Sequence, residues 1–200
     1  MKKILIYSFL LFAHISPGQN SDEYFKNGQA KKKLEDFAGA IKDFNKAIEL
    51  SPNNVEAYFN RGDAKQKLAD FKGSIMDFNK VIELLPNDAR AYFNRGIGKY
   101  GLNDFNNAIL DYDKAIELNT KDGDMYFNRG LAKYEIKDYP GAIADYQKAI
   151  EIVPFDANAY YNIGLSKYLL EDIKGACLDW KKANELGAKS ALELIGEYCK

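Results

Sequence analysis

The pentapeptide Tyr-Phe-Asn-Arg-Gly occurs three times in this chain, and successive copies are 34 residues apart. Complete copies occupy 58–62, 92–96 and 126–130, with degenerate copies at 24–28 and 160–164. A period that never slips indicates one small structural unit stacked five times rather than a single irregular core. Counting from this period places the repeats at 21–54, 55–88, 89–122, 123–156 and 157–187.

Each repeat contains two amphipathic patterns with a break between them, as the third repeat illustrates. Its first half carries small and apolar residues at helical spacings, namely Ala91, Tyr92, Gly96 and Tyr100. Asn103-Asp104 interrupts this pattern, and apolar residues then recur every three or four positions from 105 to 116. We therefore predict two helices per repeat. Because neither helix can bury its apolar face alone, neighbouring pairs must stack.

The period, the paired helices and the Pro-containing connectors at 51–54, 85–88 and 153–156 together resemble the tetratricopeptide repeat family. The resemblance covers residues 21 to 187 and implies an all-α, right-handed solenoid of helix-turn-helix repeats. After residue 187 the pattern changes, because Gly187-Ala188 replaces the connector and the apolar residues form one short amphipathic stretch. We expect residues 188–200 to form a helix that caps the open end of the stack.

The two cysteines fall at the C-terminal end of the chain. If the capping helix runs antiparallel to the helix that holds Cys177, its last turn brings Cys199 next to that residue. We therefore predict a disulfide between Cys177 and Cys199. Two separate buried thiols are the alternative, whereas a catalytic pair is disfavoured because neither CxxC spacing nor a histidine activates either sulfur.

Residues 1–18 have the layout of a secretory signal peptide. A basic head, Met1-Lys2-Lys3, precedes a mainly apolar stretch at 4–15, and small residues precede a cut after Gly18. Twelve apolar residues are too short to cross about 30 Å of hydrocarbon, so a retained anchor is the weaker alternative. We predict an exported chain, periplasmic or secreted and bacterial rather than eukaryotic, with no stable membrane insertion after cleavage.

Composition argues against nucleic-acid binding and catalysis. Once Lys2 and Lys3 are removed with the leader, 26 basic and 29 acidic side chains remain, a net charge of -3. No basic block offers a field for nucleic acid. The single histidine, His14, lies in the leader, so the mature chain lacks the commonest general base and metal ligand. We predict no enzymatic activity, metal, cofactor or small-molecule substrate.

One arginine recurs at the same position in the three central repeats, as Arg61, Arg95 and Arg129. An aspartate also recurs in every repeat, as Asp43, Asp77, Asp111, Asp145 and Asp179. A feature shared by every repeat serves stacking and solubility, so we interpret these residues as ion pairs between helices. The sequence leaves open whether each arginine pairs within its own repeat or with the preceding one, and a functional row of anion-binding arginines is the alternative.

The resemblance implies that the first helices of the repeats line a concave groove. An asparagine recurs on this face, as Asn60, Asn94, Asn128 and Asn162. Such a row can hydrogen-bond the backbone of an extended peptide, although asparagine also suits any polar helix face. Aromatic residues gather in the C-terminal half of the same face, namely Phe93, Phe127, Tyr161, Tyr100, Tyr134 and Tyr168.

These features predict a protein or peptide as partner. The leading hypothesis is a non-catalytic interaction module that binds an extended peptide or a partner helix in the groove and acts as an exported adaptor or scaffold. The alternative is a structural subunit of a cell-envelope assembly that uses its convex face or its capped end.

Overall fold

The computed structural model describes residues 17–200, so the predicted leader lies outside the described residues apart from Pro17 and Gly18. Within that range the chain is all helical. The helices are α1 Pro17–Lys33, α2 Phe37–Leu50, α3 Val55–Lys67, α4 Phe71–Leu84, α5 Ala89–Gly101, α6 Phe105–Leu118, α7 Gly123–Glu135, α8 Tyr139–Ile152, α9 Ala157–Leu169, α10 Ile173–Glu185 and α11 Ala191–Tyr198. The predicted all-α repeat architecture is confirmed.

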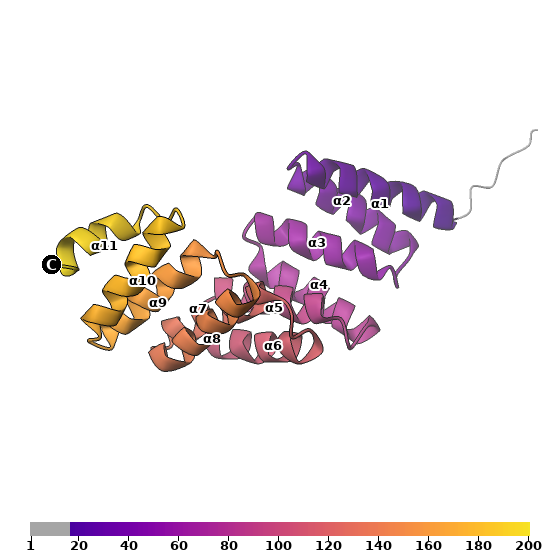
Figure 1. Ribbon diagram of the computed structural model, residues 1–200. Helices are drawn as coiled ribbons and strands as arrows, with labels where there is room; N and C mark the ends of the chain where they lie inside the picture. The colour runs from indigo at the N-terminus through magenta and orange to yellow at the C-terminus, as the bar shows by residue number, and fades with distance from the viewer. Residues whose placement is uncertain (1–16) are drawn as a thin grey trace, which may run out of the picture.

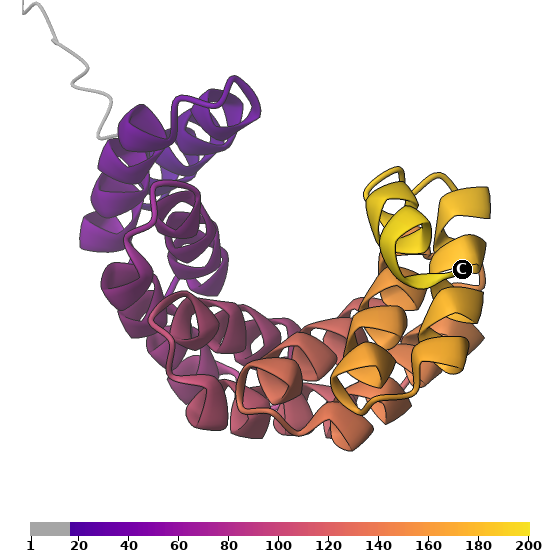
Figure 2. The same ribbon diagram turned by 90° about the vertical axis from the view of Figure 1, so that its left-hand side faces the viewer.

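The helices pack in chain order, each against the one before and the one after (Figure 1). Four of the first helices begin at the residue that the sequence register places first in a repeat, namely Val55, Ala89, Gly123 and Ala157. The stacked pairs form a curved solenoid, which Figure 2 shows as an open arc. No helix in the range 17–200 combines the length and the apolar character needed to span a membrane.

The recurring glycine exists because a ring from the second helix lies directly against it. A Cβ atom on Gly96 would be 2.6 Å from Cε1 of Tyr112, far inside van der Waals contact. Tyr112 is fully buried, and the same position holds the buried rings of Phe44, Phe78, Tyr146 and Trp180 in the other repeats. A methyl group at the glycine would therefore push the two helices of a repeat apart.

The turn between the two helices of each repeat has the same backbone conformation in all five repeats. One residue in each turn has a left-handed conformation, with φ between 58 and 65°, namely Glu35, Ala69, Asn103, Lys137 and Glu171. The next residue is aspartate, and in four of the five repeats its carboxylate caps the second helix by accepting a hydrogen bond from the N–H of a glycine three residues later. In the third repeat Asn107 replaces that glycine, and Asp104 makes no such cap.

The predicted arginine–aspartate pairs are present, and each arginine pairs with the recurring aspartate of its own repeat. Arg95 donates from Nε to Asp111 at 2.8 Å and from Nη2 at 2.6 Å, within its own repeat. Its Nη1 donates to Asn79 of the preceding repeat at 2.7 Å. Arg61 and Arg129 make the equivalent contacts. Each arginine therefore links the two helices of its repeat to the repeat before it.

The C-terminal end is closed by α11, which packs on α10 and, with it, around the buried Trp180. Tyr198 lies with its ring centroid 6.1 Å from that of Trp180. Cys177 and Cys199 form a disulfide in the structure, with Cα atoms 5.6 Å apart. The short last helix thus covers apolar surface that would otherwise be exposed at the end of the stack.

Candidate functional site: the concave face

The first helices of the repeats lie on the inner side of the arc. Successive first helices contact each other, α1 with α3, α3 with α5 and α5 with α7. On a curved stack the elements of successive repeats approach most closely on the inner side, and Figure 2 shows the direction of the curve. The face of these helices that carries the asparagine row is therefore the candidate site.

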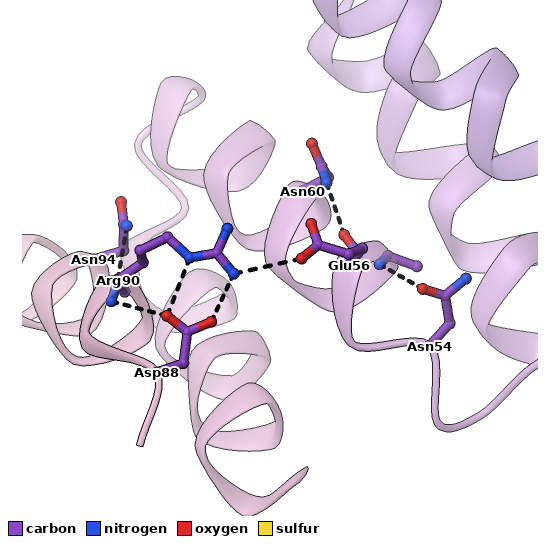
Figure 3. Close-up of polar contacts among 7 residues, drawn as sticks. Asn54, Glu56, Asn60, Asp88, Arg90 and Asn94 are labelled. Atoms are coloured by element: carbon purple, nitrogen blue, oxygen red, sulfur yellow. Dashed lines mark hydrogen bonds and ion pairs between the residues drawn. The ribbon is translucent and has the colours of Figure 1, made fainter. Parts of the chain in front are cut away.

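Each asparagine of the row is oriented by its own helix. The Nδ2 atom donates to the carbonyl oxygen four residues earlier, at 2.8 Å for Asn60, Asn94 and Asn128 and 2.9 Å for Asn162. A carbonyl can only accept, so this bond fixes the amide nitrogen toward the helix and the Oδ1 acceptor away from it. Figure 3 shows the oxygens of Asn60 and Asn94 projecting to the same side.

Asn60 differs from the other members of the row, because its acceptor is already occupied. Asn60 is only 8% exposed, and its Oδ1 accepts a hydrogen bond from Nζ of Lys32 in α1 at 2.7 Å. Lys32 also pairs with Asp63 at 2.9 Å. The lysine from the first repeat therefore occupies the acceptor that a peptide would need.

The asparagines of repeats 3 to 5 remain open. Asn94, Asn128 and Asn162 are half-buried, and across residues 17–200 no side chain or backbone N–H donates to their Oδ1 atoms. Three acceptors thus stand at equivalent positions of three successive repeats. The available part of the predicted row is shorter than expected by one member.

The polar groups between repeats 2 and 3 are paired with each other (Figure 3). Arg90 contacts Asp88 at 2.7 Å and Glu56 at 3.4 Å, and its guanidinium lies 4.8 Å from the centroid of the Phe59 ring. Burial alone would raise the pKa of Asp88, but hydrogen bonds and charge from Arg90, with two backbone N–H groups, hold that pKa below its usual value. These charges are committed to one another, which disfavours an anion site at Arg90.

Three of the predicted aromatic residues pack mainly between helices. Phe93 and Phe127 are half-buried and pack against Tyr112 and Tyr146 with ring centroids 5.8 and 5.5 Å apart. Tyr161 packs against the C-terminal core cluster around Trp180. These three rings serve packing between helices first, and each is only partly exposed to a ligand.

Tyr100 and Tyr134 are half-buried, and each is held by an edge contact with the ring that begins its second helix. The centroid distances are 5.2 Å to Phe105 and 5.5 Å to Tyr139. Tyr168, in contrast, contacts Tyr198 at 4.7 Å and Trp180 at 5.9 Å. The last helix therefore draws Tyr168 into the C-terminal cluster, which the sequence prediction did not foresee.

Sequence reasoning missed the acidic residues of α7. Glu135 follows Tyr134, and its Oε1 accepts a hydrogen bond from the Tyr100 hydroxyl at 3.4 Å. The same position is Lys33, Lys67, Gly101 and Leu169 in the other repeats. That difference was the signal available in the sequence.

Among residues 17–200 the structure brings together no group of three or more acidic, histidine or cysteine side chains suited to a metal ion.

Two family models match the chain. The TPR repeat model matches residues 22–68 and 133–171, and the tetratricopeptide repeat model matches residues 55–88 and 89–122. No curated protein sequence matches the chain. Many solved structures share the fold.

The MamA protein, known from a crystal structure, is 30% identical to this chain in sequence. The match covers 87% of this chain and 95% of the MamA chain, with a TM-score of 0.79. MamA from Desulfovibrio magneticus RS-1 is 21% identical over 84% of this chain and 96% of that chain, with a TM-score of 0.81. YrrB, described as a TPR protein with an unusual peptide-binding site, is 21% identical over 87% and 90%, with a TM-score of 0.74. The chain belongs to the tetratricopeptide repeat family, whose members generally act as non-catalytic protein-interaction modules.

Proposed function

We propose that the chain binds an extended peptide segment of a partner protein on its concave face, across repeats 3 to 5, and acts as an exported adaptor or scaffold. The observation that carries this proposal is the row of three open acceptors at Asn94, Asn128 and Asn162. Each acceptor has a fixed direction, because its amide nitrogen is bound to its own helix. A pre-oriented acceptor costs little conformational entropy when it binds.

The spacing of the row suits the backbone of an extended chain. Packed helices lie about 8 to 10 Å apart. A peptide in the extended polyproline II conformation has three residues per turn and advances about 3.1 Å per residue, so every third backbone N–H faces the same side and meets the next acceptor. Asn–backbone contacts of this kind carry affinity without reading side chains, and the aromatic rings beside them supply apolar contact area.

Export rests on the leader at 1–18 and on the cysteine pair. A basic head followed by a short apolar stretch and small residues is typical of secretory signals. Disulfides persist mainly outside the reducing cytosol, so a bond between Cys177 and Cys199 supports the same location. Edman sequencing of the protein recovered from its own envelope fraction tests this part, since a mature N-terminus at residue 1 contradicts cleavage.

The groove is tested by changing both Asn94 and Asn128 to alanine. Partner capture by crosslinking from the envelope fraction should fall by at least tenfold, while the far-UV circular dichroism and the urea midpoint stay close to those of the wild type. The matched control is Asn106→Ala, an exposed asparagine on α6, outside the row. Unchanged capture by the double variant would contradict the role of the row.

The structure contains one observation that favours the alternative, an envelope assembly built through the outer face. Three second helices expose a large apolar side chain at the same repeat position: Met76 at 72%, Leu110 at 63% and Leu178 at 71%. Replacing Met76 and Leu110 by lysine should leave groove binding intact. Loss of partner capture in this variant, with normal capture by the asparagine variant, would favour the structural function instead.

A further inference from the structure

Helix α7 carries negative charge along the face that lines the groove. Asp124, Asn128, Leu131 and Glu135 are spaced by four, three and four residues, which places them on one side of a helix. The equivalent residues at the two ends of this stripe are Arg90 and Gly101 in α5, and Asn158 and Leu169 in α9. In repeats 3 to 5 the acidic stripe is therefore specific to α7.

The Glu135 carboxylate lacks a basic partner. Among residues 17–200 no lysine or arginine nitrogen lies within 4 Å of it. Other charged residues on this face form ion pairs, Lys32 with Asp63 and Arg90 with Glu56 and Asp88. Its contact is the Tyr100 hydroxyl at 3.4 Å, which is longer than the roughly 2.7 Å of a strong O–H···O bond. The carboxylate therefore keeps acceptor capacity for a charged donor.

One aromatic residue contacts this carboxylate, and a second lies near it. Tyr100 comes from the preceding repeat and donates its hydroxyl to Glu135. The pKa of the Tyr134 hydroxyl is raised first by burial and then by the nearby Tyr139 and Glu135. The rings of Tyr100 and Tyr134 are half-buried, and each makes an edge contact with one ring, Phe105 and Tyr139 respectively. Fixed rings beside a carboxylate are the elements from which binding sites for organic cations are built.

The buried hydroxyl of Tyr146 lies near Tyr100, Tyr134 and Glu135. Tyr146 is fully buried, and its hydroxyl has no hydrogen-bond partner among the described residues. Burial raises the pKa of this hydroxyl, and nearby Tyr100, Tyr134, Asp145 and Glu135 raise it further, so it remains a neutral O–H. Repeats 1 and 2 pack the same position with Phe44 and Phe78, so packing alone does not require the hydroxyl.

We propose that Glu135, Tyr100 and Tyr134 form a subsite that takes one lysine or arginine side chain of the bound peptide. The proposal rests on the peptide-binding function proposed above and names the chemistry of the partner at this point. The basic head pairs with the carboxylate and lies against the rings, while its aliphatic stem runs along Leu131. The partner segment is thus apolar, with one basic residue set among its apolar ones.

The test uses a random decapeptide display library as the probe and the full chain as the target. Peptides selected by the wild type should carry one lysine or arginine flanked by apolar residues. For one selected lysine peptide, Glu135→Gln should weaken binding about tenfold, and replacing the peptide lysine by norleucine should weaken it by a similar factor. Combining both changes should add little, because they remove the same interaction.

Glu117→Gln is the matched control, since it removes the same charge from an exposed position on α6. This control should bind the peptide as the wild type does. Selected peptides that are apolar without a basic residue would overturn the subsite and leave the groove proposal intact. Failure to select any peptide would overturn the groove proposal and the subsite with it.

Discussion

Replacing Arg95 by leucine would remove the guanidinium that joins three helices at the centre of the solenoid. Arg95 makes two hydrogen bonds to Asp111, at 2.6 and 2.8 Å, and one to Asn79 at 2.7 Å. The Asp111 side chain is only 5% exposed. The variant therefore leaves a nearly buried carboxylate that has lost its main partner.

The size of the effect follows from what remains. Breaking a buried ion pair by removing one partner costs about 3 to 5 kcal/mol. Lys99 would still lie 2.7 Å from Asp111, so part of the stabilisation is retained. We expect Arg95→Leu to lower the free energy of unfolding by about 2 to 3 kcal/mol. Lys114→Leu, which breaks an exposed pair with Glu117, should cost at most about 0.5 kcal/mol.

The fifth repeat contains a natural counterpart of this variant. Ile163 stands where the three central repeats have arginine, and Asp179 is left with Lys167 at 2.6 Å. Burial raises the pKa of Asp179, and Lys167 opposes that rise only in part. In Arg95→Leu, Asp111 would have the same kind of environment.

The pH dependence has a definite sign. When a carboxyl has a higher pKa in the folded than in the unfolded chain, its stabilising contribution is fully present below about pH 4 and is lost as pH rises through the folded pKa. The deficit of Arg95→Leu should therefore be largest at neutral pH and should shrink toward pH 4. Asp111→Asn in the Arg95→Leu background should recover part of the stability at pH 7.

Urea unfolding followed by far-UV circular dichroism at pH 7 and pH 4 measures both quantities, with hydrogen exchange locating the loss in repeats 2 to 4. A deficit no larger than that of Lys114→Leu would refute the reasoning. A deficit that is independent of pH would also refute it, because the buried charge would then not be its cause.

Three further predictions concern caps, hydroxyls and the disulfide. Asp70→Ala should lower stability by about 1 kcal/mol, whereas Asp104→Ala should cost clearly less because it makes no backbone cap; urea midpoints compare the two. Burial raises the pKa of Tyr112, so its contribution is lost as pH rises above about 10; Tyr112→Phe should be as stable as the wild type at pH 7 and should lose less stability between pH 8 and 10.5. Closing a loop of 22 residues should stabilise the C-terminal end by about 3 kcal/mol, so reduction of Cys177 and Cys199 should speed hydrogen exchange in α11; equal exchange before and after reduction would contradict this.

The starts of four first helices could be predicted because they depend on local signals. Helical spacing and the residues that end and cap helices lie within a few positions of each other in the sequence. The start of α5 at Ala89 and of α7 at Gly123 therefore coincides with the register read from the pentapeptide. The expected all-helical stack follows from the same regularity.

The contacts across repeats could not be predicted to the same degree. Lys32 reaches Asn60 and Asp63 from 28 and 31 residues away, and only the packed geometry determines that its long side chain turns toward them. Tyr168 faces the groove by its repeat position, but the direction of α11 brings Tyr198 onto it. Both outcomes depend on how helices approach in space, which a linear pattern does not contain.

The departures from the repeat contain most of the information about function. Residues shared by all repeats, such as the glycine beside each buried ring, are sufficiently explained by stacking. A glutamate stands at this repeat position only in the fourth repeat, as Glu135. It lacks a basic partner among the described residues and contacts the hydroxyl of Tyr100, whose ring is held by Phe105, and stacking does not explain these properties. Lys32 also occurs at its position only in the first repeat, and there it closes the acceptor of Asn60.

These two singular residues together limit the length of the ligand. Hydrogen bonds to charged groups contribute about 1.5 to 3 kcal/mol each, so a peptide reaching repeat 2 would have to displace Lys32 from both of its partners. The open acceptors run from Asn94 to Asn162, which is two repeat intervals of about 10 Å. At about 3.1 Å per residue this span corresponds to about six or seven residues of a polyproline II chain. The partner segment should therefore be a short peptide that binds across the last three repeats, with its basic residue near the fourth.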